Sequence, residues 1–543
     1  MWRDSSRLVK EKFDILVIGG GIHGATITRE FAEAGYSVAL VEKNDFCSGA
    51  SANSLKVIHG GIRYLQHLNI KRMRESIRSR NRLLREFPHL VRRLPCLTPT
   101  YGHGMKGREV MAVALKINDL IGWDRNEGVE EAACIPSGFT LNQKDSLKIM
   151  PGIREEGLTG AALWYDVLAE NTERLVLEFL HLAVEHGAVV ANYMGVDGFD
   201  LEEDRIAGVH LTDMITQEKI TIQPRYIINA SGAGVNKLAA MGGQKPVALG
   251  WAKAVNLIVG KQLFGKYAVG LEGVRDFYDK DALIQKGKRL FFFVPWRGKT
   301  MIGTTYAYHK QDLNKVGVTS EDLDSFLTEV NGVYPDAKLT PADVDYVHCG
   351  LVPVMDQEPP ILGDVQLDKT TTVVDHGALQ GPINFFTVKG VKYTTAVEVA
   401  SQVMQAVSPK LGRPQKTRTE TVEDSEMLSW SESGTDSKII AHLKAKYGPC
   451  CKRIVMYMGA EGDEIICRDP LCVSSEILHG IREEAALHLE DIVFRRTDLA
   501  SAGCPDRAVL ERVAVIMGNE LGWSEVRREE EIRSVFVSFT ILG

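Results

Sequence analysis

The sequence lacks any apolar run of about 18 or more residues, so it predicts no membrane-spanning helix. Its N-terminus has no apolar core followed by a small-residue cleavage site, and we expect no signal peptide. The nine cysteines form no CxxC pair and fit no iron–sulfur spacing, so we expect no metal site. Cysteines without a disulfide framework favour a reducing, cytoplasmic setting.

Other common signatures are missing as well. The net charge of -7 argues against a general nucleic-acid-binding protein. Neither a P-loop nor a Ser-His-Asp pattern stands out. The length of 543 residues predicts about two to four folding units.

The N-terminal segment carries a pattern typical of dinucleotide binding. Residues 13–18 (FDILVI) form an apolar run, as in a parallel strand that is buried on both faces. The run Gly19–Gly24 follows and fits G-x-G-x-x-G, and residues 25–35 predict a helix that ends at a glycine. Residues 36–41 predict the next strand, which ends at Glu42. Together these elements predict a Rossmann-type βαβ unit, which is more specific than the glycines alone.

Each residue type in this unit has a physical role toward a dinucleotide. Gly19 permits a tight turn, Gly21 lets a pyrophosphate approach, and Gly24 lets the helix contact the strand. The helix N-terminus offers N–H groups to the phosphates. Glu42 lies about 20 residues further on, where a carboxylate accepts from a ribose hydroxyl.

Later segments favour FAD over NAD as the cofactor. Residues 172–186 predict a helix, residues 187–196 a strand, and residues 226–234 a buried strand that ends in small residues. Return strands this far along the chain suit a long cofactor that several segments surround. An NAD enzyme usually completes its nucleotide domain within one contiguous half.

Residues 51–65 (SANSLKVIHGGIRYL) resemble the flavin-contacting segment of the FAD-dependent glycerol-3-phosphate dehydrogenases. The resemblance covers nearly the whole chain. Further motifs occur in the same order, namely Asn229–Gly232, Val294–Trp296, Ile302–Thr305, Gly390–Thr395, Ile481–Ala485 and Asp491–Thr497.

The resemblance implies an α/β fold in which a Rossmann-type FAD-binding domain is interleaved with an antiparallel-sheet substrate-capping domain. It also implies a helical C-terminal domain. We place the catalytic part at residues 1–415, a charged and Ser-rich linker at 416–437, and the C-terminal domain at 438–543.

The implied activity is the oxidation of a secondary alcohol to a ketone by hydride transfer to FAD, with glycerol 3-phosphate as substrate and dihydroxyacetone phosphate as product. Electrons would leave for a quinone or for oxygen, and the sequence does not separate these acceptors. The oligomeric state also stays open.

The resemblance assigns site residues as well. His59 matches a histidine beside the flavin, and Arg63, Tyr64 and Lys392 match residues on the substrate side. Structural roles stay open for them: an ion pair for Arg63, a core hydrogen bond for His59 and a solvated surface position for Lys392. The expected cofactor-binding residues are Gly19, Gly21, Gly24, Glu42, Lys43, Ser51, Ser54, Lys56, Val196, Asn229, Gly232, Gly390 and Thr394.

The chain departs from the family at basic positions. Val352 stands where the family has an arginine, and Pro360–Asp364 contains none where a second is expected. Asn256 replaces a histidine, and Ala396–Val397 replaces a further arginine position. Because arginine grips a phosphate with paired N–H donors, each lost contact costs about 1.5 to 3 kcal/mol.

Three interpretations therefore stay open. Another basic residue, such as Lys253, Lys389 or Arg297, replaces the lost charge. Alternatively, the substrate is a non-phosphorylated polyol, a hydroxy acid or an amine. The third alternative is a non-catalytic flavin-binding protein, against which the retained His59, Arg63, Tyr64 and Lys392 argue.

Residues 69–93 carry nine Lys or Arg against two Glu, with apolar residues at helical spacing. Such a helix can lie on an anionic membrane surface, as a peripheral enzyme on the inner face of the cell membrane would need, and residues 105–123 could assist. The alternative is a core-packed helix with a solvated charged face.

Overall fold

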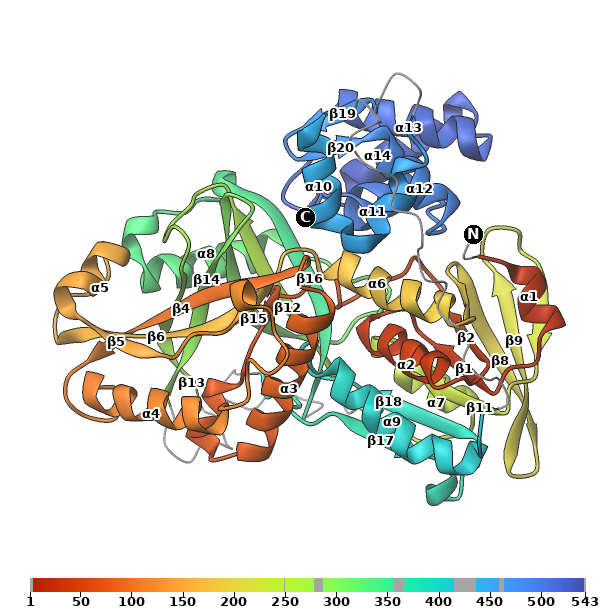
Figure 1. Cartoon of the computed structure of the whole chain (residues 1–543), viewed down its shortest axis with the longest axis horizontal. Coiled ribbons are helices and arrows are strands. Elements are labelled where there is room, and N and C mark those ends of the chain that lie inside the picture. The colour runs from red at the N-terminus through yellow and green to blue at the C-terminus, as the bar shows by residue number, and fades with distance from the viewer. Residues whose placement is uncertain are drawn as a thin grey trace.

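The computed structural model describes residues 3–248, 250–277, 287–355, 365–414, 436–458 and 463–541. Figure 1 shows three parts: an α/β part near the N-terminus, a part built around a large sheet, and a blue helical part at the C-terminal end. The first two parts are interleaved along the sequence, as expected. All but the last two residues of the expected linker, 416–437, lie outside the described residues, so its boundaries stay a prediction.

The α/β part is built on a six-stranded sheet in the order β17-β18-β11-β1-β2-β7. All its neighbours pair in parallel except β17 and β18, which are antiparallel. The strands are β1 (Ile15–Ile18), β2 (Val38–Val41), β7 (Val189–Ala191), β11 (Tyr226–Asn229), β17 (Thr372–Asp375) and β18 (Phe385–Lys389).

Both faces of this sheet are covered, which is why its strands read as continuous apolar runs. Ile15 and Val17 of β1 pack toward a helical layer, whereas Leu16 and Ile18 pack toward a second, three-stranded sheet. The helices of this part are α1 (Ser5–Lys10), α2 (Ile22–Glu33), α6 (Thr172–Glu185), α7 (Val235–Met241) and α9 (Ala396–Leu411). The three-stranded sheet comprises β8 (Met194–Glu202), β9 (Arg205–Asp213) and β10 (Lys219–Ile222).

The capping part contains a nine-stranded sheet in the order β16-β12-β15-β14-β13-β4-β6-β3, with β5 paired to β6. Its pairs are antiparallel except β13 with β4, so the expected antiparallel cap is confirmed. The strands are β3 (Val57–Ile58), β4 (Val91–Tyr101), β5 (Phe139–Asn142), β6 (Leu158–Ala169), β12 (Gly250–Val259), β13 (Ala268–Phe277), β14 (Gly287–Trp296), β15 (Lys299–His309) and β16 (Val344–Val354). The helices are α3 (Ile70–Glu86), α4 (Arg108–Ile121), α5 (Gln143–Ile149) and α8 (Ser320–Val333).

The C-terminal part is helical and has its own apolar core, as the resemblance implies. It also contains one small hairpin and a short π-helical segment at Asp491–Arg496. Its elements are α10 (Ser437–Tyr447), α11 (Cys451–Val455), β19 (Ile465–Arg468), β20 (Leu471–Val473), α12 (Ser474–Arg482), α13 (Arg507–Leu521) and α14 (Glu525–Val537).

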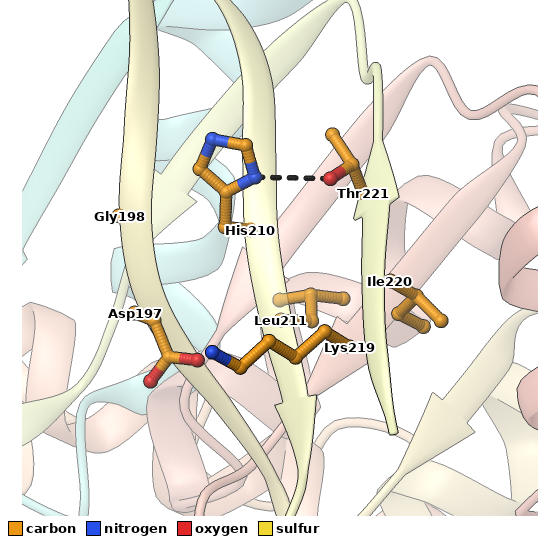
Figure 2. A pocket seen from close by; sticks show the side chains of 7 residues that line it. All are labelled: Asp197, Gly198, His210, Leu211, Lys219, Ile220 and Thr221. Atoms are coloured by element: carbon orange, nitrogen blue, oxygen red, sulfur yellow. Dashed lines mark hydrogen bonds between the residues drawn. The ribbon is translucent and has the colours of Figure 1, made fainter. Parts of the chain in front are cut away.

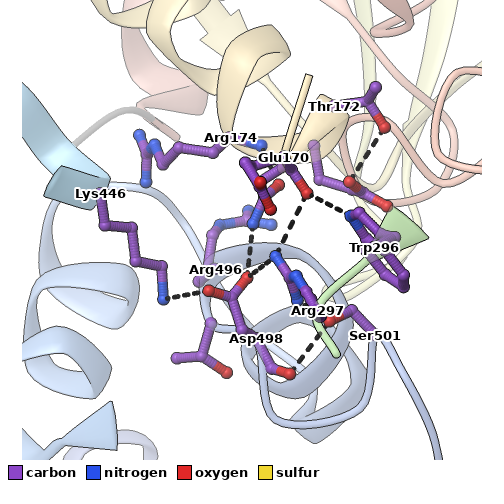
Figure 3. Close-up of polar contacts among 12 residues, drawn as sticks. Glu170, Thr172, Arg174, Trp296, Arg297, Lys446, Arg496, Asp498 and Ser501 are labelled. Atoms are coloured by element: carbon purple, nitrogen blue, oxygen red, sulfur yellow. Dashed lines mark hydrogen bonds and ion pairs between the residues drawn. The ribbon is translucent and has the colours of Figure 1, made fainter. Parts of the chain in front are cut away.

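Buried ion pairs join the C-terminal part to the rest of the molecule. Asp498 of the C-terminal part faces Arg297, which follows β14, and also Lys446 of α10, which belongs to the same part as Asp498 (Figure 3). The N–O distances are 2.6 Å to Arg297 and 3.6 Å to Lys446. Arg174 of α6 holds Glu484 through both of its Nη atoms. Arg174 and Glu484 are each only 1% exposed, so the interface depends most on both partners of this pair staying in place.

The basic segment 69–93 differs from its expectation. Its helix α3 ends at Glu86, and residues 91–93 already belong to β4. Pro88 explains the end, because a proline disfavours helical geometry in the residue before it. The apolar face of α3 is buried through Met73, Ile77 and Leu84, so this helix packs into the core and does not present an apolar face to a membrane.

Within the described residues, none of the helices is both long and apolar enough to cross a bilayer. The nine cysteines all lie in described segments and are all free thiols.

Candidate active site

A cavity of about 1690 Å³ lies where the carboxyl ends of the parallel strands meet the capping sheet. It is lined by the turn between β1 and α2, by the end of β2, by residues 48–55, by residues 347–353 of β16 and by Gly390–Lys392. Ligands of open parallel sheets bind at this edge of the strands.

The glycines of the first turn are required by close contacts. Gly19 has a φ of +115°, and a Cβ there would lie 2.6 Å from the Ala230 carbonyl oxygen. A Cβ on Gly24 would overlap the carbonyl oxygen of Gly19. The N–H of Ile22 donates to Ser51 Oγ at 3.0 Å, so residues 51–55 are held against the start of α2. The turn therefore leaves backbone open to the cavity, as a pyrophosphate needs.

Glu42 stands at the end of β2 and lines the cavity beside Lys43 and Val196. Its carboxylate accepts from the N–H of Gly20 at 2.7 Å and of Asn44 at 2.9 Å. Burial raises the pKa of Glu42, although these hydrogen bonds act in the opposite direction. Two carboxylate oxygens offer about four acceptor positions, so Glu42 keeps capacity for a ribose hydroxyl.

His23 is a cavity residue that the sequence analysis did not single out. Burial lowers its pKa to about 4, and its Nδ1 has no hydrogen-bond partner among the described residues. The ring lies so close to Gly390 that a Cβ there would overlap it. A buried polar atom without a partner on the cavity wall fits a polar cofactor such as FAD.

The structure places the other predicted cofactor residues in two groups. Ser51, Ser54, Gly232 and Gly390 line the cavity together with Gly19, Gly21, Glu42, Lys43 and Val196. Gly24, Lys56, Asn229 and Thr394 do not belong to its lining.

Of the four predicted residues outside the lining, Lys56 and Asn229 stabilise the segments that form the cavity wall. Lys56 is buried and its Nζ donates to Ala52 O, to Thr172 Oγ1 and to Glu173 at 2.7–2.9 Å. This contact ties the 51–55 segment to α6, and Glu173 neutralises the Lys56 ammonium. The Asn229 amide donates to Val235 O at 2.9 Å and fixes the turn after β11.

The predicted catalytic residues come together on the capping side. Lys392 donates to the Tyr64 hydroxyl, and its Nζ lies 4.4 Å from the centre of that ring. The rings of His59 and Tyr64 are 6.0 Å apart, and Tyr64 belongs to the 3₁₀ helix η1 (Ile62–His67). Lys392 lines the cavity, and the contacts of Tyr64 with Lys392 and His59 place this group next to that wall, although His59, Arg63 and Tyr64 are not among the lining residues.

Burial and charge set the protonation of this group. Burial lowers the pKa of His59 to about 4, and Lys392 and Arg63 add to the effect against the opposing charge of Asp166. His59 is therefore neutral near neutral pH and can accept a proton. Burial lowers the pKa of Lys392 to about 8, and the neighbouring Arg72 contributes as well.

The departures from the family pattern are also visible in three dimensions. Val352 and Asn256 line the cavity, and Asn256 Oδ1 accepts from Thr304 Oγ1 at 2.7 Å. Ala396 and Val397 are buried at the start of α9 and belong to the core. Pro360–Asp364 lies outside the described residues.

The three suggested replacement cations are engaged elsewhere. Lys253 pairs with Asp322, Lys389 pairs with Asp368, and Arg297 pairs with Asp498. These residues lie far apart along the chain, and no local motif could have shown the pairing.

Figure 2 shows a second cavity, of about 370 Å³, on the three-stranded sheet. His210 Nδ1 lies 2.9 Å from Thr221 Oγ1, the contact marked in Figure 2. Its Nε2 lies 2.8 Å from the exposed Asp200. Both ring nitrogens of His210 already have a partner, so this cavity does not indicate a catalytic site. Across the described residues, no group of three or more His, Cys, Asp or Glu could hold a metal ion.

Comparison with protein families gives two matches. Residues 14–387 match the model described as FAD dependent oxidoreductase. Residues 413–528 match the model described as the C-terminal domain of alpha-glycerophosphate oxidase.

Curated relatives match over most of the chain. The chain is 29% identical to a glycerol-3-phosphate dehydrogenase of Synechocystis sp. over 557 residues, which covers 98% of this chain and 97% of the relative. It is 29% identical to the same kind of protein from Mycobacterium leprae, covering 97% and 88% of the two chains. An alpha-glycerophosphate oxidase of Lactococcus lactis is 32% identical over 353 residues, which covers 64% of this chain and 56% of the relative.

Among solved structures, a Bacillus halodurans glycerol-3-phosphate dehydrogenase complexed with FAD superposes with a TM-score of 0.72. It is 22% identical, and the match covers 98% of this chain and 96% of that one. This likeness shows that the fold is shared.

Proposed function

We propose a function on the premise that the chain belongs to the FAD dependent oxidoreductase family, whose model matches residues 14–387. The protein is thus an FAD-dependent oxidoreductase. We infer that its substrate is glycerol 3-phosphate and its product dihydroxyacetone phosphate, as the names of its full-length relatives suggest. Bound FAD supplies the acceptor for the hydride that leaves the substrate carbon.

Residues of the chain would hold the cofactor by the contacts described above. The turn at Gly19 and Gly21 and the N-terminus of α2 suit the pyrophosphate, and Glu42 suits the ribose of the adenosine half. Residues 51–55 and Gly390 bring backbone to the same cavity on the capping side.

The single observation that carries the proposed reaction is the group of His59, Tyr64 and Lys392 at the capping side of the cavity. Neutral His59 takes the hydroxyl proton of the substrate while the carbinol hydride leaves. Lys392 and Arg63 hold the substrate through their charge, and Tyr64 fixes the position of Lys392.

The direct test is anaerobic reduction of the purified flavoprotein without an electron acceptor. Glycerol 3-phosphate should bleach the flavin absorbance, whereas glycerol at the same concentration should not. Bleaching by glycerol or another uncharged polyol alone would replace the proposal with the second candidate, which the apolar Val352 on the cavity wall favours. No bleaching by a broad panel of alcohols and amines would refute both.

We further propose that the electrons pass to a quinone and that the enzyme touches the membrane through α4. This helix and the residues beside it expose a row of large apolar side chains, of which Leu120 and Trp123 are 74% and 78% exposed. Lys116 is exposed on the same helix, and so is Glu109 in its first turn, so the apolar row is the feature that supports this contact. An amphipathic helix of this kind lies in the interface of an anionic bilayer. Figure 1 shows α4 at the outer edge of the capping part, away from the C-terminal domain.

Flotation with phosphatidylglycerol vesicles tests this contact. The double variant Leu120→Ser/Trp123→Ser should lose vesicle binding and quinone reduction, yet keep reduction of a water-soluble dye. The control Val526→Ser removes an exposed apolar side chain from α14 and should change neither activity. Equal flotation of all three proteins would exclude α4 as the contact.

A further inference from the structure

The hairpin of the C-terminal part carries two cysteines that face each other. It is formed by β19 and β20, which Figure 1 shows at the outer edge of that part. In their antiparallel register Cys467 stands directly opposite Cys472. Both side chains pack against the same apolar core of the C-terminal part, on one face of the hairpin. Both residues are free thiols in the structure.

Two residues in this relation have the spacing that a disulfide needs. The Cα atoms of directly opposite residues in an antiparallel pair lie about 4.5 to 5.5 Å apart. A disulfide joins residues whose Cα atoms are about 4.4 to 6.8 Å apart and whose Cβ atoms do not point away from each other. The register therefore allows Cys467 and Cys472 to be joined without any change in the pairing of the two strands.

Within the described residues, the other seven cysteines do not stand opposite one another in a strand pairing. Two of them lie in strands, and each faces an apolar residue: Cys96 is opposite Trp164, and Cys349 is opposite Val255. The remaining five lie outside the strands. The hairpin pair is thus the one that the strand register brings together.

The two thiols of the hairpin differ in their access to water. Cys467 is half-buried, whereas Cys472 is 1% exposed. Burial raises the pKa of the Cys472 thiol well above its ordinary value, and the nearby Glu476 and Cys467 act in the same direction. Because the thiolate is the reactive form, an oxidant in solution reacts first with Cys467. Cys472 is then the neighbouring thiol that can attack the oxidised sulfur.

The hairpin is connected to the interface between the C-terminal part and the rest of the molecule. Val473, directly after Cys472, donates its N–H to Glu476 of α12 at 3.0 Å. Glu476 also accepts from Lys446 Nζ at 3.0 Å, and Lys446 faces Asp498, which pairs with the capping part. A covalent bond between the two strands therefore fixes the start of α12 and supports this series of charged contacts.

We propose that Cys467 and Cys472 form a reversible disulfide on exposure to hydrogen peroxide, and that this bond strengthens the C-terminal domain against unfolding. In the first step the Cys467 sulfur bonds to one peroxide oxygen, the O–O bond breaks, and one water leaves. In the second step the Cys472 sulfur bonds to the Cys467 sulfur, the S–O bond breaks, and a second water leaves. The two thiols lose two electrons, which the peroxide accepts, and both thiol protons leave in the two waters.

Trypsin provides a direct assay, because it cleaves after Arg468, between the two cysteines. The FAD-loaded full chain is treated with hydrogen peroxide, the remaining thiols are alkylated in denaturant, and the peptides are identified by mass spectrometry. The proposed disulfide links peptide 454–468 to peptide 469–482, and dithiothreitol separates them again by thiol–disulfide exchange.

Three variants accompany the wild type. We expect the linked peptides in the wild type and in the control Cys504→Ser, which removes an exposed thiol from the same domain. We expect none in Cys467→Ser or in Cys472→Ala, because each lacks one of the two sulfurs.

Amide hydrogen exchange over α12 measures the effect on the domain. After peroxide treatment of the wild type, exchange through unfolding of the domain should slow about 10-fold or more, as expected of a disulfide that closes a short loop, and dithiothreitol should restore the original rate. Cys467→Ser should show no slowing after the same treatment, and it corrects for peroxide oxidation of methionines.

Two results would overturn the disulfide: peptides that link Cys467 or Cys472 to any other cysteine, or a product in which peroxide adds only oxygen to Cys467. Unchanged exchange over α12 in a wild type that carries the linked peptides would overturn the strengthening of the domain. Neither measurement involves the substrate, so both results are independent of the proposed function.

Discussion

Asp45 offers a sharp test of how the C-terminal domain is joined to the cofactor cavity. It lines the cavity just after β2, and its side chain is 1% exposed. Its carboxylate accepts from Arg496 at 2.6 and 2.8 Å, from Asn192 at 2.9 Å and from Arg495. Burial alone would raise the pKa of Asp45, but the two arginines outweigh it and hold the pKa below its ordinary value.

Asp45→Asn keeps the side-chain volume and removes the charge, so Arg496 stays buried without its carboxylate. Breaking a buried pair in this way costs about 3 to 5 kcal/mol. We expect the free energy of unfolding of the interface to fall by about 3 kcal/mol. Urea titration, followed by the release of flavin fluorescence, should show this loss as a lower midpoint. Flavin release and detachment of the C-terminal domain should occur at the same urea concentration, because Asp45 lines the cofactor cavity and also pairs with Arg496 of that domain.

The control is Asp200→Asn, whose partner His210 is also largely exposed. An exposed pair contributes about 0.2 to 1 kcal/mol, so this variant should keep nearly wild-type stability. The reasoning would be refuted if both variants unfolded at the same urea concentration.

The stability that Asp45 contributes also depends on pH in a predictable direction. Because the folded pKa of Asp45 is depressed, its contribution is present above the unfolded pKa and is lost as the pH falls through the folded value.

Three further results are expected at the site. Gly24→Ala should purify largely without FAD, because its Cβ would overlap Gly19 O, whereas Gly104→Ala has nothing within 4 Å and should keep its visible flavin absorbance. His59→Gln should slow anaerobic flavin reduction by about 100-fold with little change in substrate affinity, since it removes the proposed proton acceptor. The kcat/KM for glycerol 3-phosphate should fall above about pH 8, where Lys392 loses its charge, and Lys392→Arg should move this fall to higher pH; an unchanged pH profile would count against the role of Lys392.

The sequence predicted the parts of the molecule in which local pattern and local structure agree. Strand β1, the glycine turn, helix α2 and Glu42 follow one another within a few dozen residues, and the structure arranges them as expected. The apolar runs were informative because both faces of the parallel sheet are buried. The end of α3 was misplaced although Pro88 marked it, because the run of basic residues continues past the proline.

The sequence did not show contacts between distant segments. Lys56 was expected to face the cofactor, yet its ammonium is bound by Glu173, 117 positions away. Lys389 was a candidate for a cation that replaces the missing arginine, but it forms an ion pair with Asp368. Periodicity gives the face of one element, whereas pairing of charges depends on which elements the fold brings together.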